Sequence, residues 1–346
     1  MTISRRRLLK QGLGGLAAAS LPLWSYAEEG SQALQPGWER KFGITPSGKP
    51  SGRILTAFGE ESLASRLAHA GAEQMQKFYT PIEYQHVSMP GDNTIRATLN
   101  AKYAPADGTT ILEVHSPTFN SFPALYRELP YAQTDFKPLA IMSEYTLFFT
   151  VGPVVDDSVE TIDDYIDWVR DNPEYASMGF TQYGSPGHFA QLIFARAKQP
   201  AIRPQPYRET AMMVEDMLDG VLAAGMVIGG TRLDLYENDT LRVLATTSRT
   251  RYGDWDHVPT CREQGIDDMD VGGWYGWFVH QQVPDAIYSE LKTAVEFTVS
   301  ARDYSKLLSE NALQPSYDTD FELFFRLEEE AEKYRALAQS FRLGKV

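Results

Sequence analysis

The sequence is poor in the residues that support covalent and metal chemistry. Its 346 residues include one cysteine, Cys261, so no intramolecular disulfide can form and core packing must supply the stability. We expect Cys261 to be a small buried or half-buried residue rather than a reactive thiol. The six histidines are scattered without His-x-x-x-His spacing. Residues 268–272 resemble the start of a calcium loop, but Val279 stands at the position that requires glutamate.

Motifs for catalysis and for nucleotide binding are also missing. No glycine-rich phosphate loop follows any expected strand. Ser185 and His188 resemble part of a nucleophile elbow, but that motif needs glycine two residues before the serine, where Tyr183 stands. Together these absences predict a protein that is not an enzyme and that holds no metal or cofactor.

The N-terminus has the pattern of a targeting segment. Consecutive arginines at residues 5–7 precede an apolar stretch at residues 12–23, and small residues follow up to Ala27. The arginine pattern resembles a Tat signal, and an ordinary Sec signal is the alternative. We expect residues 1–27 to be a signal peptide, residues 28–50 to be a tether or N-terminal arm, and the mature protein to lie in the periplasm. No long apolar run follows, which argues against a membrane-spanning protein.

The charge balance is strongly acidic. Removal of the expected signal peptide leaves 28 basic and 46 acidic residues, a net charge of −18. Such a surface repels nucleic acid and anionic lipid, so neither is an expected partner. It also repels anionic ligands at long range. An acidic ligand must therefore be held by local donors.

Strands and helices alternate along the chain. This pattern is typical of an α/β sheet with parallel pairing, and the length favours two lobes. Ser62 and Ser158 stand where they can cap helices, and the region from Pro284 onward is strongly helical. We expect strands at residues 53–58, 82–87, 109–114, 145–151, 178–180 and 241–247.

Three expected strand ends run into helices. They are residues 58–62, 181–185 and 207–211. Main-chain N–H groups at a helix N-terminus, together with the helix dipole, bind carboxylates well. Arg208 adds a planar cation that suits a carboxylate. Each loop could equally be an ordinary strand-to-helix turn.

From residue 53 to the C-terminal helix, the chain resembles the receptors of tripartite tricarboxylate transporters, the Bug family of periplasmic binding proteins. No single landmark is specific, but the ordered set is. The landmarks are residues 105–112, 129–131, 135–140, 158–173, 183–185 with His188, 206–208, 241–245 with Ser248 and Arg251, 258–260, Glu263 with Gly265, and Trp274 with Gly276.

The resemblance implies a two-lobe α/β clamshell of the type II-like periplasmic-binding-protein kind, with the ligand between the lobes. Lobe 1 would comprise residues 51–148 and 266–346, and lobe 2 residues 149–265. The implied function is capture of a small carboxylate and its delivery to membrane permease subunits, by a monomer. The implied ligand-binding residues are Phe58, Gly59, Glu60, Ser62, Ser116, Thr118, Thr181, Tyr183, Gly184, Ser185, His188, Tyr207, Arg208 and Thr210.

The chain departs from the family pattern at the expected site. The first loop is shorter than usual, reads Gly-Glu-Glu at residues 59–61, and has Ser62 where the family has aspartate. Glu209 replaces a common glycine. Added glutamates repel a carboxylate, so a ligand with an amine or hydroxyl, or a larger aromatic acid, becomes a candidate. Two other functions stay open: a Tat-exported enzyme, and a sensor domain that presents a ligand to a signalling partner.

Overall fold

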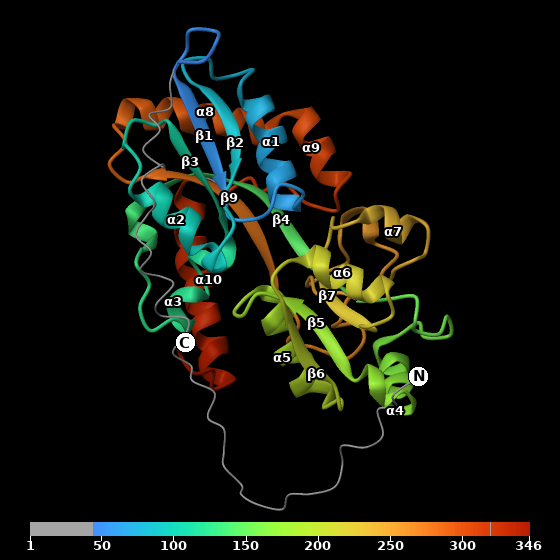
Figure 1. Ribbon diagram of the computed structural model, residues 1–346. Coiled ribbons are helices and arrows are strands. Elements are labelled where there is room, and N and C mark those ends of the chain that lie inside the picture. Colours follow the sequence, from blue (N-terminus) through green and yellow to red (C-terminus); the bar gives the residue numbers. More distant parts are fainter. Residues whose placement is uncertain (1–43, 319) are drawn as a thin grey trace, which may run out of the picture. The chain divides into compact units, whose positions relative to one another are not determined.

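The computed structural model describes residues 44–318 and 320–346 (Figure 1). The compact unit considered below is Ile44–Val346. The expected signal peptide and most of the expected tether lie outside the described residues. Ile44 pairs with Pro50 in an isolated bridge directly before the first strand.

One nine-stranded sheet organises the unit, in the order β2-β1-β3-β9-β4-β7-β5-β6, with β8 paired to β4. Its first half is built on three parallel strands, β2, β1 and β3. β9 runs antiparallel to β3 and to the first part of β4. The bounds are β1 (Ser51–Thr56), β2 (Glu83–Ser88), β3 (Thr110–His115), β4 (Phe136–Val151) and β9 (Gly272–His280).

The second half of the sheet is also built on three parallel strands, with β5 between β6 and β7. β7 and β8 flank the last part of β4 and run antiparallel to it. The bounds are β5 (Ser177–Thr181), β6 (Arg203–Tyr207), β7 (Ala224–Ile228) and β8 (Arg242–Thr246).

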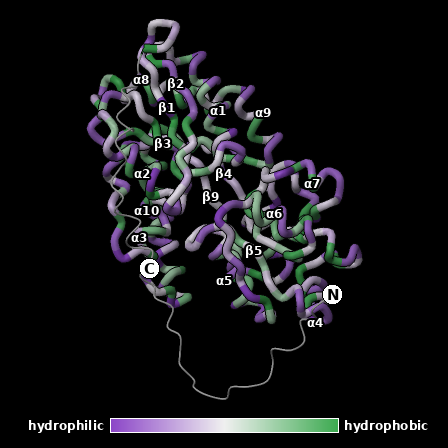
Figure 2. Tube along the Cα trace, viewed as in Figure 1, coloured by the Kyte–Doolittle hydropathy of each residue, from purple (hydrophilic) through white to green (hydrophobic). Residues whose placement is uncertain are grey.

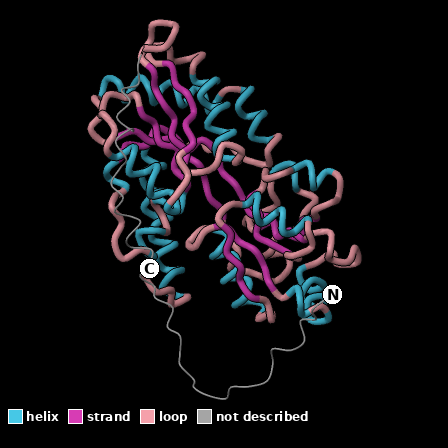
Figure 3. The backbone as a smooth tube through the Cα atoms, viewed as in Figure 1, coloured by secondary structure: helices cyan, strands magenta, loops and turns pink. Residues whose placement is uncertain are grey.

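β4 connects the two half-sheets because it changes partner in its middle. Thr146 is the last residue paired with β9, and Leu147 is the first paired with β7. The long strand can be followed from one half-sheet into the other in Figure 3. We call the two halves the first half-sheet (β2, β1, β3, β9 and residues 136–146) and the second half-sheet (residues 147–151, β7, β5, β6 and β8).

Helices pack against both half-sheets, and green, hydrophobic residues alternate with purple, hydrophilic ones along them in Figure 2, as expected of helices with one buried face. The bounds are α1 (Leu63–Met75), α2 (Ile95–Lys102), α3 (Phe122–Leu125), α4 (Ile162–Asp171), α5 (Pro186–Lys198), α6 (Thr210–Leu218), α7 (Leu233–Glu237), α8 (Asp285–Ser300), α9 (Arg302–Ser309) and α10 (Asp320–Ser340).

Side-chain caps fix where three helices begin. The Ser62 hydroxyl accepts a hydrogen bond from the Ser65 N–H at the start of α1. Ser185 caps α5 by accepting from the His188 N–H. The prediction that Ser158 caps a helix is wrong: Thr161 and Asp164 form a capping box, so α4 begins at Ile162.

The core has a layer on each face of the first half-sheet. Trp274 and Trp277 of β9 are fully buried and belong to different apolar clusters, because odd spacing along a strand places side chains on opposite faces. Leu323 and Leu327 of α10 pack in the Trp274 cluster. Tyr334, further along the same helix, contacts Phe189 of α5 beside the second half-sheet. α10 therefore packs on both halves.

The single cysteine is buried, as the sequence predicted. Burial raises the pKa of the Cys261 thiol to about 12, so the group is neutral at physiological pH. Within the described ranges, no helix has the length and apolar composition needed to cross a bilayer.

Candidate ligand-binding site

The parallel strands of both half-sheets end close to the point where β4 changes partner. His115, the last residue of β3, pairs with Tyr275, and Ile228, the last residue of β7, pairs with Leu147. Because carboxyl ends of parallel strands share one edge, the loops that follow them gather there. These loops contain most of the residues expected to bind ligand.

The first loop, residues 58–62, joins β1 to α1. The Ser88 hydroxyl donates to the Phe58 carbonyl at 2.6 Å, which fixes the start of the loop. The Glu60 carboxylate lies 3.3 Å from Nδ1 of His86. Burial lowers the pKa of His86 and Glu60 opposes the shift. Ser62 caps α1 and leaves other N–H groups of its first turn without a carbonyl partner inside the helix.

The second loop, residues 181–185, joins β5 to α5. Gln182 and Gly184 both adopt positive φ angles, 60° and 83°, which is uncommon for glutamine. The Ser185 hydroxyl donates to the Thr181 carbonyl while it caps α5. The Ser185 hydroxyl is thus held by main-chain groups, which argues against a nucleophilic role.

The His188 ring supports this loop from within its own half. Its Nδ1 accepts from the Gly184 N–H at 3.2 Å, and the ring packs against Phe180 and Tyr183. Burial lowers the pKa of His188 to about 4, so the ring is neutral. Tyr183 itself is half-buried.

The third loop follows β6 and carries Tyr207, Arg208, Glu209 and Thr210. The Tyr207 hydroxyl donates to Asp216 at 2.7 Å, so the side chain turns toward α6 of its own half. The Tyr207 carbonyl accepts from the Gln182 N–H at 3.0 Å, which ties the second and third loops together. Arg208 is exposed and forms no salt bridge with any described residue. Thr210 opens α6.

A short turn after β3, η3 (Ser116–Thr118), contributes two more expected residues. Both are buried, and the Thr118 hydroxyl shares a hydrogen bond with Thr94 at 2.9 Å. Three residues further on, the Ser121 hydroxyl donates to the Gly184 carbonyl at 2.6 Å. This bond links the first half of the molecule to the second loop.

The loops from the two halves also touch at two other places. A side-chain carbon placed on Gly59 would lie 3.5 Å from Oε1 of Glu209, so the carboxylate of the third loop lies over the first loop. Gly230, after β7, packs against Leu63 at the start of α1 and against Asn311. The structure therefore brings the three predicted loops together, although the Tyr207 hydroxyl and the His188 ring point into their own half.

One functional candidate was missed in the sequence. His115 ends β3, is 4% exposed, and lies among Phe58, Tyr145 and Tyr275 at ring separations of 5.3 to 5.7 Å. Its Nε2 is 2.5 Å from the Tyr145 hydroxyl. Burial lowers the pKa of His115 to about 3, against a smaller opposing effect of Gln182. A lone histidine directly before Ser116 at a buried strand end was the available signal.

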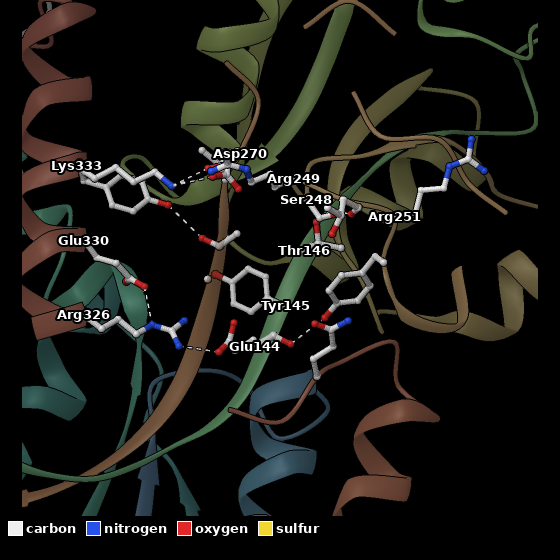
Figure 4. Close-up of a pocket in the computed structure, with 17 residues that line it drawn as sticks. Glu144, Tyr145, Thr146, Ser248, Arg249, Arg251, Asp270, Arg326, Glu330 and Lys333 are labelled. Atoms are coloured by element: carbon white, nitrogen blue, oxygen red, sulfur yellow. Dashed lines mark hydrogen bonds and ion pairs between the residues drawn. The ribbon is translucent and has the colours of Figure 1, made fainter. Parts of the chain in front are cut away.

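A cavity of about 260 Å³ lies beside the strand segment where β4 changes partner, and Figure 4 shows its lining. We call it the hinge cavity. No residue expected to bind ligand lines it. Its charged lining residues are Glu144, Arg249, Arg251, Asp270, Arg326, Glu330 and Lys333.

Arg326 of α10 is the centre of the ionic network in the hinge cavity. Its guanidinium donates to Glu144 at 2.6 Å, to Asp318 at 2.8 Å and to Glu330 at 2.9 Å. Burial lowers the pKa of Arg326, but Glu144 and Glu330 outweigh this and raise it. The network attaches α10 to β4, as the dashed lines in Figure 4 show.

Replacement of Arg326 by methionine should therefore destabilise the protein by about 2 to 3 kcal/mol, because three carboxylates lose their shared cation. Chemical denaturation measures the loss. Arg335→Met, which breaks an exposed pair with Glu332 on the same helix, is the control and should cost less than about 1 kcal/mol. Equal losses in the two variants would show that the network adds nothing beyond a surface pair.

A second cavity, of about 530 Å³, lies between α1 and β2. Of the expected binding residues it includes only Glu60. Its lining also contains His69, Glu73, Glu83 and His86, but nowhere in the described chain do three or more potential ligands gather in a metal-binding arrangement.

Comparison with known proteins gives one family and one fold. Residues 88–343 match the model of the tripartite tricarboxylate transporter family receptor. A UPF0065 protein of Bordetella pertussis is 22% identical over 267 residues, which are 76% of this chain and 80% of that protein.

Two solved structures show the same architecture. Rpa4515 of R. palustris, solved with adipate, has a TM-score of 0.79 at 21% identity and covers 86% of this chain and 98% of its own. MatC of Rhodopseudomonas palustris, solved with bound malate, has a TM-score of 0.73 at 17% identity, with coverage of 83% and 98%. The likeness confirms the expected two-lobe α/β fold of periplasmic solute-binding proteins.

Proposed function

Because the chain belongs to the tripartite tricarboxylate transporter receptor family, we propose that it captures a small organic acid in the periplasm and delivers it to the permease subunits of a tripartite transporter. The observation that carries this proposal is the meeting of strand-end loops from both half-sheets. Glu209 lies over Gly59, and Ser121 donates to Gly184. A ligand held by these loops would contact both lobes at once.

The loops supply donors suited to an acid. α1 and α5 each begin at a capping serine, Ser62 and Ser185. The Leu63 and Ala64 N–H groups have no partner within α1, and α5 adds the Gly187 N–H alone, because its first residue is a proline. Two helix N-termini on facing lobes present these groups together with the positive ends of their dipoles. Local donors of this kind overcome the long-range repulsion by a net charge of −14 for the whole chain.

The lobes would move about the β4 segment where the strand changes partner. The lobes would be residues 51–148 with 266–346 and residues 149–265, and the change of partner between Thr146 and Leu147, close to residue 148, supports this division. Binding would favour the closed arrangement because only that arrangement completes the site. Export by a Tat signal and action as a monomer are part of the same proposal.

A ligand that binds the folded protein must raise its melting temperature. We expect one or more small carboxylates, tested with adipate and malate first, to raise Tm; a concentration of 100 Kd corresponds to about 2.7 kcal/mol. Differential scanning fluorimetry measures the shift, and small-angle X-ray scattering should show a smaller radius of gyration with ligand. Neutral sugars of the same size are the control. A panel of organic and amino acids that leaves both quantities unchanged would refute the proposal.

A further inference from the structure

Two buried polar groups at the end of β3 lack partners. Nδ1 of His115 and Oγ of Ser116 complete no hydrogen bond of full geometry with a described residue, although the Tyr145 hydroxyl lies near Ser116, and the two side chains are 4% and 0% exposed. Gln182 of the opposite lobe lies close to the His115 ring but completes no hydrogen bond with Nδ1. Unpaired buried polar groups are rare and costly, so a molecule absent from the chain itself is the expected partner.

The chemistry of these groups fits an acid. The His115 ring is neutral, and its Nε2 lies 2.5 Å from the Tyr145 hydroxyl. When Tyr145 donates to Nε2, Nδ1 carries the proton and can donate it to an acceptor. The Ser116 hydroxyl can donate as well. A carboxylate offers the acceptor oxygens for both.

Glu209 suits a positively charged group of a ligand rather than an acid group. Its half-buried carboxylate lies over Gly59 of the facing lobe. At position 209 itself, the family pattern that the sequence resembles has glycine instead of glutamate. It forms no side-chain hydrogen bond with any described residue and does not cap α6. The neighbouring Arg208 is exposed and does not pair with it. A carboxylate in this position repels a second acid group and attracts a cation.

We propose that the ligand is a zwitterion whose acid group takes the donors of His115 and Ser116 and whose ammonium group takes Glu209. This inference rests on the proposed function and deepens it, since it names the class of acid that the receptor selects. Glu209 is then the residue that sets specificity, because it distinguishes an amino acid from the dicarboxylate of the same length.

Matched ligand pairs test the inference. Aspartate differs from malate only in an ammonium in place of a hydroxyl, and 5-aminopentanoate differs from adipate only in an ammonium in place of a carboxylate. Isothermal calorimetry on the mature protein should give a lower Kd for the ammonium member of at least one pair. Glu209→Gln should weaken that member at least about tenfold and should not weaken its partner, because the repulsion of an acid group at this position is removed.

Two further variants give the experiment its controls. Glu215→Gln removes the same charge from the exposed side of α6, the helix that follows Glu209, and should not change the preference. His115→Phe keeps an aromatic ring but removes Nδ1, and should weaken both members of a pair to a similar degree, because both carry the shared carboxylate. The melting temperature of each free variant checks that it folds.

The outcomes separate this inference from the proposed function. Tighter binding of the malate and adipate members in every pair that binds, or an unchanged preference in Glu209→Gln, overturns the zwitterion proposal and leaves the receptor assignment intact. Failure of all four compounds to bind the wild-type protein overturns the proposal that the ligand is a zwitterion. The wider acid panel described above then tests the receptor assignment separately.

Discussion

The Gly230→Val variant is expected to lose more than about 4 kcal/mol of unfolding free energy, or to fail to fold. Gly230 has a φ of +90°, a conformation that β-branched residues avoid. A side-chain carbon there would collide with the main-chain carbonyl of Asn311, which cannot move aside as a flexible side chain can. The same carbon would lie 3.4 Å from Leu63 at the start of α1.

A matched control isolates the collision from the backbone strain. Gly220→Val places the same residue at a φ of +70°, but the nearest atom, in Val154, is 3.9 Å from the added carbon. It should cost about 1 to 2 kcal/mol from strain alone. Urea denaturation of both variants gives the comparison. If Gly230→Val were no less stable than Gly220→Val, the result would contradict the close contact between Gly230 and the Asn311 carbonyl.

The second large effect is a loss of stability as pH rises, caused by Glu113. This carboxyl group of β3 is 4% exposed and accepts from the Trp277 indole at 3.0 Å, while its other oxygen has no partner. Burial raises its pKa from 4.5 to about 8, and the bond from Trp277 opposes the shift. The nearby phenols of Tyr275 and Tyr304 are also buried.

The sign follows from proton linkage. At a pH between the unfolded-state pKa of 4.5 and the folded-state pKa of about 8, Glu113 keeps a proton in the folded protein that it releases in the unfolded chain. The stabilising contribution is therefore complete below pH 4.5 and is lost as pH rises through about 8. The loss has a ceiling of about 1.4 kcal/mol per pH unit, or about 4 kcal/mol between pH 5 and pH 8.

Glu113→Gln should remove this dependence, because the amide keeps an acceptor for Trp277 and cannot ionise. The difference in unfolding free energy, variant minus wild type, should grow from pH 5 to pH 8 and then level off. The exposed Glu174→Gln serves as control and should show no such growth. A difference that stays constant across this range would mean that Glu113 ionises normally in the fold.

Local sequence signals predicted the elements that hold the candidate loops. Ser62 was recognisable as a helix cap, and β1 and β3 as short apolar strands, because these features depend on neighbours in sequence. The three loops could then be placed at strand ends. Their assignment to ligand remains a prediction.

Several strands could not be predicted from the sequence, because features within them weaken the local strand signal. β6 contains Pro204 and Pro206, which a strand tolerates at the edge of a sheet, where β6 lies. β9 contains three glycines that weaken the strand signal and is held by its two neighbours β3 and β4. The first half of β4 includes Pro138 at an irregularity in the ladder with β9. Tertiary pairing decides each of these segments.

The residues of the candidate site that the sequence did not indicate also depend on contacts between residues far apart in the chain. His115 becomes a candidate only when Phe58, Tyr145 and Gln182 surround it, and these residues are far apart in sequence. The approach of Glu209 to Gly59 likewise joins two lobes. The substitution at residue 209 was visible in the sequence, but its place over the first loop was not.

The central claim is that the ligand lies between the strand-end loops of the two lobes. A crystal structure of the protein with the acid that raises its Tm most would test this directly. We expect the ligand to contact residues 58–62 and 181–185, with its acid group within hydrogen-bond distance of His115 or of the N–H groups that begin α1 and α5. An acid bound instead in the hinge cavity, against Arg249 and Lys333, with the loops unoccupied, would contradict the claim.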